Sequence, residues 1–345
     1  MGKIKPPLDY IPPPEQNEKP HLSWTQINMY LRCGMQYYFR YIKGLKCPPN
    51  NALLIGLGTH LTVEANMRYK LENNRMLPRD EIESRAHENV LRIADEDGVY
   101  CVAGQTHRYV VDESRRVAAI CSLAHYDIIA PKLRPKYVEE PFKLKMPDFP
   151  YDIHGRIDLE EEPLTATNTP IIRDTKTTRM LKSRELAAQD QMTIYAAYAL
   201  RKYGIMPSMY VDSIVWGTKK VRVVPIQAER EKFEIVVLGR RIAAMARALK
   251  KGIFLPSLSD QWWCNEKWCG YWHKCPYARR IHVSEGALAN AKELCNVQRC
   301  KDVPAKLIGK VHAESRSEAQ PRRGGKRAGP DGGAGLAGAG GKKLW

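Results

Sequence analysis

The sequence predicts an α/β fold in which helices cover a mixed sheet. Apolar residues recur at helical spacing in four early segments, near 23–43, 59–72, 81–95 and 112–130. Prolines then punctuate three short alternating segments that are typical of strands, at about 137–145, 152–160 and 170–176. The pattern ends with a helix, a strand and a helix, at about 184–203, 209–216 and 229–251. Strands and helices do not alternate regularly, so a repeating βαβ array is excluded.

The two ends of the 345-residue chain differ in composition from its middle. Residues 1–20 are rich in proline and charge, which predicts a flexible arm. Residues 313–345 are rich in glycine, lysine and arginine, which predicts a disordered tail. We therefore expect one folded domain at 21–280, followed by an extension at 281–312.

Composition favours a polyanionic partner and a cytoplasmic protein. The formal net charge is +17, and a field of that sign attracts nucleic acid, although a solvated basic tail gives the same number. The chain has no apolar stretch of the roughly 20 residues that span a bilayer, and no signal sequence at its N-terminus. Its nine cysteines are then expected to be thiols or metal ligands.

Two acidic residues and a lysine form a candidate hydrolytic centre. Strict alternation predicts that His154, Arg156, Asp158 and Glu160 share the polar face of one strand, opposite Ile153, Gly155, Ile157 and Leu159. On the next strand Asp174 and Lys176 share a side. If the strands pair, Asp158 and Asp174 converge on one divalent cation such as Mg²⁺, beside an ammonium group. The alternative is the polar face of an ordinary hairpin.

Two helices add polar residues to faces that should be apolar. We expect Gly58-Thr59-His60 to open a helix whose buried stripe holds His60, Glu64, Met67 and Leu71. His60 is then either a metal ligand or a hydrogen-bonded core histidine. In the later helix, Gln191 and Tyr195 share a stripe with Ala188 and Tyr198, where they contact phosphate or base, or simply satisfy one another.

Three cysteines near the end of the folded region cannot complete a tetrahedral metal site alone. Cys264, Cys269 and Cys275 are separated by four and five residues, so a fourth ligand is needed, and zinc with four cysteines or with His273 is compatible with the spacing. The nearby aromatic residues are expected to pack around the sulfur atoms, with base stacking as the alternative: Trp262, Trp263, Trp268, Tyr271 and Trp272. Cys47, Cys101, Cys121, Cys295 and Cys300 show no comparable pattern and are expected to be ordinary thiols.

Read in order, these motifs resemble the PD-(D/E)XK nuclease superfamily, and within it the RecB-like branch. The resemblance rests on five segments over about residues 23–277: S-W-T-Q-I-x-x-Y-x-x-C at 23–33, G-T-H at 58–60, G-R-I-D at 155–158, D-T-K at 174–176 and Q-x-x-x-Y at 191–195. It implies a restriction-endonuclease-like core. The long helical segment at about 65–135 departs from the family pattern and is expected to be an insertion.

The resemblance also implies roles for individual residues. His60, Asp158 and Asp174 would bind Mg²⁺ or Mn²⁺, and Lys176 would assist the attacking water. Gln191 and Tyr195 would lie beside the active centre and contact DNA. Cys33 would join Cys264, Cys269 and Cys275 around a [4Fe-4S] cluster in the region 255–280, with zinc as the alternative.

The implied activity is cleavage of DNA, as an exonuclease acting on single strands or duplex ends. Related proteins act in recombination, repair and phage DNA processing, so a bacterial or phage-infected cytoplasm is expected. The chain has no P-loop motif, so a helicase or recombination partner would be a separate protein. The alternatives are a non-catalytic DNA-binding subunit of a helicase-nuclease complex and a zinc-stapled RNA-processing nuclease.

Overall fold

The computed structural model describes residues 20–102, 104–146, 149–163, 169–217, 220–258, 261–266 and 268–278. Contacts divide the chain into units Met1–Val283 and Ser284–Trp345, and every described residue belongs to the first. The predicted arm, except for Pro20, lies outside the described residues. So do the predicted extension and tail, together with Cys295 and Cys300.

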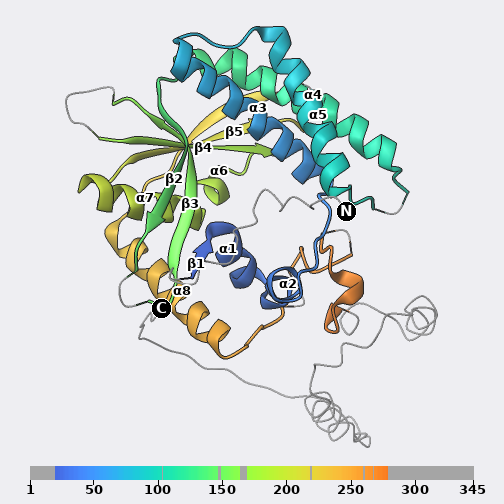
Figure 1. Cartoon of the computed structure of the whole chain (residues 1–345), viewed down its shortest axis with the longest axis vertical. Coiled ribbons are helices and arrows are strands. Elements are labelled where there is room, and N and C mark those ends of the chain that lie inside the picture. The colour runs from blue at the N-terminus through green and yellow to red at the C-terminus, as the bar shows by residue number, and fades with distance from the viewer. Residues whose placement is uncertain are drawn as a thin grey trace, which may run out of the picture. The chain divides into compact units, whose positions relative to one another are not determined.

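A six-stranded mixed sheet forms the centre of the described unit (Figure 1). Its strands are β1 (His21–Ser23), β2 (Pro135–Leu144), β3 (Asp152–Glu161), β4 (Ile171–Thr178), β5 (Ser208–Val215) and β6 (Arg222–Gln227). The order is β1-β3-β4-β5-β6, and β2 pairs with β3 off this path. β1 is parallel to β3 and β4 is parallel to β5, whereas the other pairs are antiparallel. The predicted mixed sheet is confirmed, but β1 and β6 were not predicted.

The helices lie near the predicted positions with shifted ends. They are α1 (Trp24–Arg32), α2 (Gly34–Tyr37), α3 (Asn51–Asn73), α4 (Arg79–Asp97), α5 (His107–Ile128), α6 (Ser183–Ala187), α7 (Asp190–Tyr203) and α8 (Lys232–Lys250). A π-helical turn at Tyr38–Ile42 and two 3-10 turns, at Ala130–Lys132 and Trp272–Lys274, complete the list. None of the helices in the described part of the chain is long and apolar enough to cross a membrane.

Capping residues explain where two of these helices begin. Ser23 and Gln26 form a reciprocal capping box at the start of α1, with the Ser23 amide donating to Gln26 Oε1 over 2.7 Å. The Asn50 side chain accepts a hydrogen bond from the Leu53 amide at 3.0 Å, so α3 begins at Asn51. The prediction that Gly58-Thr59-His60 opens this helix is therefore wrong, and His60 lies in its middle.

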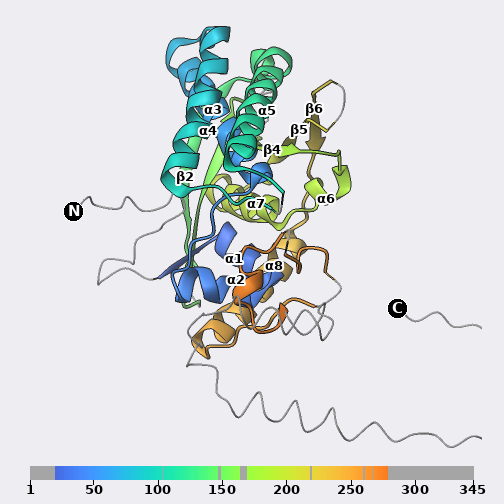
Figure 2. The same ribbon diagram turned by 90° about the vertical axis from the view of Figure 1, so that its right-hand side faces the viewer.

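Two helical layers cover opposite faces of the sheet (Figure 2). On one face, α1, α7 and α8 pack on the strands through a large core that includes Ile27, Met192 and Ile242. On the other, α3 and α5 contact the strands, and α4 packs outside them. Most of the predicted insertion is therefore α4, α5 and the second half of α3.

The strict alternation predicted along β3 is wrong at one point, which is where the candidate site lies. Ile153 and Ile157 pack with α7, but Leu159 packs with Val63 and Met67 of α3, on the opposite face. β2 changes faces in the same way, from Val138 on the α3 side to Phe142 on the α7 side. Between these two residues Glu139 has a φ of 53°, a left-handed conformation that ends regular pleating.

Candidate active site

One edge of β3 is only partly paired, and side chains complete it. β2 runs along one edge of β3, so β1 and β4 share the other, with β1 at the start of β3 and β4 at its last three residues. In the stretch between them, the Tyr195 hydroxyl donates to the carbonyl of Arg156 at 2.9 Å. The Asp158 carboxylate accepts the amide of Thr175 at 3.0 Å. Asp158 is thereby held at the point where β3 and β4 separate, facing β4.

Asp174 and Lys176 on β4 form a buried ion pair. The Asp174 side chain is fully buried, and its Oδ2 lies 2.8 Å from Lys176 Nζ, which is about one-third exposed. Burial raises the pKa of Asp174 to about 6, against the opposing attraction of Lys176. Burial acts to lower the pKa of Lys176, but the attraction of Asp174 and Asp158 outweighs this effect and raises the pKa above its ordinary value. The ammonium therefore stays charged. The register of β3 and β4, continued by one residue, places Asp158 opposite Asp174.

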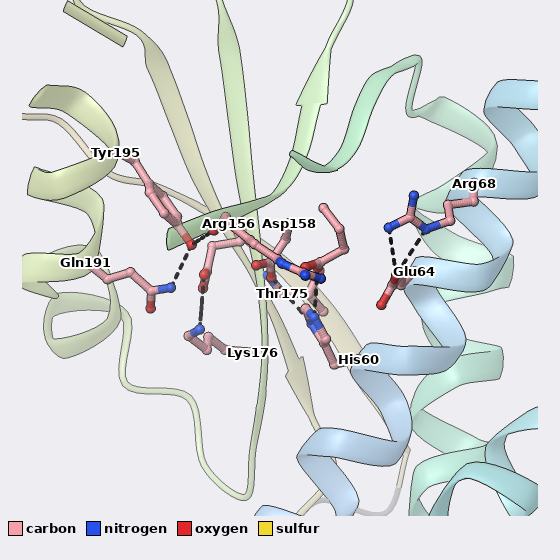
Figure 3. Close-up of polar contacts among 11 residues, drawn as sticks. His60, Glu64, Arg68, Arg156, Asp158, Thr175, Lys176, Gln191 and Tyr195 are labelled. Carbon is pink, nitrogen blue, oxygen red and sulfur yellow. Dashed lines mark hydrogen bonds and ion pairs between the residues drawn. The ribbon is translucent and has the colours of Figure 1, made fainter. Parts of the chain in front are cut away.

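His60 reaches the same place from α3 (Figure 3). Its Nδ1 is 3.5 Å from Asp158 Oδ2, and its Nε2 is 2.9 Å from Glu139 Oε1. Burial disfavours the charged imidazole most strongly, yet the combined attraction of Asp158 and Glu139 raises the pKa of His60 to about 9. Glu139 was not singled out from the sequence. A charged residue in the middle of a predicted strand was the only signal that could have pointed to it.

Glu64 lies one turn after His60 and extends the acidic group. It accepts two hydrogen bonds from Arg68, at 2.9 and 3.0 Å. One ligand atom each from His60, Glu64 and Glu139 lie within 4.8 Å of one another. The predicted buried stripe is correct for Met67 but wrong for Leu71, which is 43% exposed, because the second half of α3 extends beyond the sheet.

Gln191 and Tyr195 lie on α7, on the other side of Asp158 from His60 (Figure 3). The Gln191 amide donates to the Tyr195 hydroxyl at 2.7 Å, and Tyr195 is 2% exposed. Burial raises the pKa of Tyr195 well above its ordinary value, so its hydroxyl remains a donor to β3. Ala188 does not share their stripe, because α6 ends at Ala187 and α7 begins at Asp190.

The donor set fits a hard divalent cation. His60, Asp158, Glu64 and Glu139 line one pocket between α3 and the sheet. Asp174 Oδ2 and Glu139 Oε1 are buried, and within the described part of the chain each is partnered solely by a cationic group less than 3 Å away. Carboxylate oxygens with an imidazole nitrogen suit Mg²⁺ or Mn²⁺.

A second ionic network supports the strands from the α5 side. Arg173 donates to Glu161 on β3 and, at 2.8 Å, to Asp212 on β5. The side chain of Asp212 is 1% exposed, and burial raises its pKa to about 6 despite the guanidinium. Burial also lowers the pKa of His125 on α5 to about 3, so this neighbour stays neutral. Arg173 thus neutralises two buried carboxylates next to the candidate site.

The four cysteines expected to form a metal site line one pocket. Cys33 comes from the end of α1, and Cys264, Cys269 and Cys275 come from the segment after α8. The Gln36 amide donates to Cys269 Sγ and the Ser257 backbone amide donates to Cys33 Sγ, both at 3.3 Å. Burial raises the pKa of Cys264, Cys269 and Cys275, and the neighbouring thiols add to this effect. Donors aimed at sulfur stabilise thiolates when a metal is bound.

The aromatic residues of this region divide into two groups. Trp263, Tyr271 and Trp272 line the cysteine pocket, as predicted. Trp262 and Trp268 do not, since they are 62% and 45% exposed and contact each other edge to face. Their predicted packing around the sulfur atoms is wrong. Cys47, expected to be an ordinary thiol, lies in the same apolar cluster as Cys269.

Comparison with known proteins gives a family match over most of the chain. The sequence profile described as the PD-(D/E)XK nuclease superfamily matches residues 21–276. No curated protein matches. Among solved structures, a candidate exonuclease from Eubacterium rectale is 11% identical with a TM-score of 0.45, covering 81% of this chain and 94% of that one. The structure of SSO0001 is 14% identical with a TM-score of 0.29, covering 75% of this chain and 96% of that one.

Proposed function

Because this chain belongs to the PD-(D/E)XK nuclease superfamily, whose members hydrolyse phosphodiester bonds, we propose that it is a DNA exonuclease dependent on Mg²⁺ or Mn²⁺. The net charge of +17 supports a nucleic-acid substrate. Single strands or duplex ends are the proposed substrate, in recombination, repair or phage DNA processing. A helicase or recombination protein is the proposed partner.

One observation carries the proposal. His60 on α3 lies 3.5 Å from Asp158 on β3, and Asp174, opposite Asp158 on β4, is paired with Lys176. These three residues would hold the cation. When bound, such a cation polarises a phosphoryl oxygen and lowers the pKa of a water molecule.

The neighbouring residues would support this cation and the bound phosphate. Lys176 is partly exposed and stays charged, so its ammonium would orient the attacking water or stabilise charge on the phosphate. The Thr175 amide fixes the Asp158 carboxylate, and the Tyr195 hydroxyl ties α7 to β3. Arg156 is exposed two residues before Asp158 and offers a contact for a neighbouring phosphate.

We also propose that Cys33, Cys264, Cys269 and Cys275 hold a [4Fe-4S] cluster that joins α1 to the C-terminal segment. A tetrahedral zinc ion would place its sulfur ligands about 3.8 Å apart. Among the described residues, no three of these cysteines bring their sulfur atoms within 4.8 Å of one another. His273, the alternative fourth zinc ligand, is paired with Glu266 and does not line the pocket. A cluster with one cysteine per iron suits the wider spacing better than zinc does.

Cleavage of end-labelled single-stranded DNA with Mg²⁺ or Mn²⁺ tests the function. Asp174→Ala and Lys176→Ala should each reduce the rate by at least about 100-fold, because each removes a group that acts on the reacting phosphate. Asp112→Ala, at an exposed position of α5, and Lys182→Ala, at an exposed position just before α6, are matched controls and should cleave like the wild type. Equal cleavage by all five proteins would remove the site assignment. No cleavage by any of them, with DNA binding intact, would indicate a non-catalytic binding subunit.

Labels at the 5′ and 3′ ends separate the modes of cleavage. An exonuclease first releases labelled mononucleotides or short products from one end. An endonuclease instead produces labelled fragments of intermediate length with either label. An RNA strand of the same sequence should be cleaved more slowly than the DNA strand. Faster cleavage of the RNA would instead support an RNA-processing nuclease.

A further inference from the structure

Glu139 contacts the candidate site but belongs to none of the motifs that predicted it. It lies on β2 between the pairs Val138–Leu159 and Glu140–Ile157, and therefore opposite Asp158. It is 9% exposed. A carboxylate this buried needs a cationic or hydrogen-bonding partner, because burial alone disfavours its charge.

The backbone of Glu139 is held in an unusual conformation. Its φ of 53° is left-handed, and among the described residues Asn74 is the other non-glycine residue with a positive φ. Asn74 is a helix C-cap, where that conformation is common, but Glu139 lies inside a strand. Left-handed residues within strands are sparsely populated and concentrate at functional sites. At this position β2 also changes faces, so the conformation directs the Glu139 side chain towards α3.

The partner of Glu139 is one particular nitrogen of His60. Glu139 Oε1 lies 2.9 Å from His60 Nε2 and has no other partner among the residues that the structure describes, while His60 Nδ1 faces Asp158. A proton held on Nε2 by Glu139 leaves the lone pair of the neutral ring on Nδ1, the nitrogen on the side of the candidate cation. Metal-binding histidines are commonly oriented by a carboxylate in this way.

We propose that Glu139 is a positioning residue that orients His60 so that Nδ1 binds the divalent cation. This inference rests on the proposed function, since it takes His60 as a ligand. It assigns the role to an accepting oxygen at Glu139, without direct contact between Glu139 and the cation. Glutamine keeps that oxygen, whereas glycine removes it and also accepts the left-handed backbone.

Binding of Mn²⁺ to the full chain without DNA tests the proposal. Affinity is measured by calorimetry at pH 8.5, where proton competition at His60 is much weaker than at pH 7, and histidine coordination is measured by the nitrogen coupling in pulsed electron paramagnetic resonance of bound Mn²⁺. Glu139→Gly should weaken binding roughly 10- to 100-fold and remove the nitrogen coupling. Glu139→Gln should lose less than about tenfold and keep it. Glu140→Gln, a matched loss of charge on the next residue, should bind like the wild type.

Each result has a separate meaning. Wild-type affinity and nitrogen coupling in Glu139→Gly would overturn the proposal. Equal losses in Glu139→Gln and Glu139→Gly would also overturn it, because the negative charge would then matter and Glu139 would be a direct ligand. If Glu139→Gly fails to fold by circular dichroism, loss of the nitrogen coupling in Glu139→Gln but not in Glu140→Gln would overturn the proposal. Absence of His60 coupling in the wild type would instead refute the metal site of the proposed function.

Discussion

Binding of Mn²⁺ should become much tighter as the pH rises from 7 to 8.5, because the cation must displace a proton from His60. The pKa of His60 in the metal-free protein is about 9, since Asp158 and Glu139 outweigh the effect of burial. At pH 7 only about one molecule in a hundred has a neutral imidazole, and at pH 8.5 about one in four. The apparent affinity should therefore rise roughly 25-fold over this range. Asp174, with a pKa near 6, is already mostly ionised at pH 7 and adds little.

Calorimetry measures this coupling directly. Titrations at pH 7 in two buffers with different enthalpies of ionisation give the number of protons released, which should be about one per cation. His60→Gln should bind more weakly and change less than about twofold with pH. His107→Gln, at an exposed histidine that begins α5, is the matched control and should keep the wild-type slope. A flat wild-type profile, or a slope that survives in His60→Gln, would refute the reasoning.

The same pKa has a consequence for stability in the absence of metal. The folded-state pKa of His60 lies above the ordinary value of 6.5, so the protonated ring stabilises the fold. This contribution is fully present below about pH 6.5 and is lost as the pH rises through 9. Bound cation should therefore raise the urea midpoint more at pH 8.5 than at pH 7.

Three further substitutions test other parts of the structure. Arg173→Met should lower the free energy of unfolding by about 3–5 kcal/mol in urea denaturation, because two buried carboxylates lose their cation. Arg173→Lys should lower it by less. Equal stability of the wild type and both variants would contradict the ionic network. Tyr195→Phe should lower the free energy of unfolding by about 1–3 kcal/mol, since the carbonyl of Arg156 loses its donor in the unpaired stretch of β3. An unchanged urea midpoint would show that this hydrogen bond is dispensable. Cys269→Ala should abolish bound iron and the absorbance at about 400 nm. Cys121→Ala, which removes a buried thiol elsewhere, should keep the iron and the absorbance. Loss of iron from both variants, or from neither variant, would count against the cluster assignment.

Local patterns were sufficient for most of the elements and for part of the site. Alternation by two residues placed Asp174 and Lys176 on one side of a strand, and they form an ion pair there. The same rule failed along β3, because the apolar side chains of this strand change from one face of the sheet to the other between Ile157 and Leu159. β6 was not predicted because its segment contains Pro225, which lowers the strand signal at what proves to be the far end of the sheet.

The sequence by itself determined the mixed α/β fold and the order of the motifs, because periodicity and residue type are properties of neighbours along the chain. Only the tertiary structure brought His60, Glu139 and Asp158 together, from α3, β2 and β3. It also decided that the Tyr195 hydroxyl completes an unpaired strand edge. These contacts depend on strand pairing and on one left-handed residue, and neither leaves a periodic signal in the sequence.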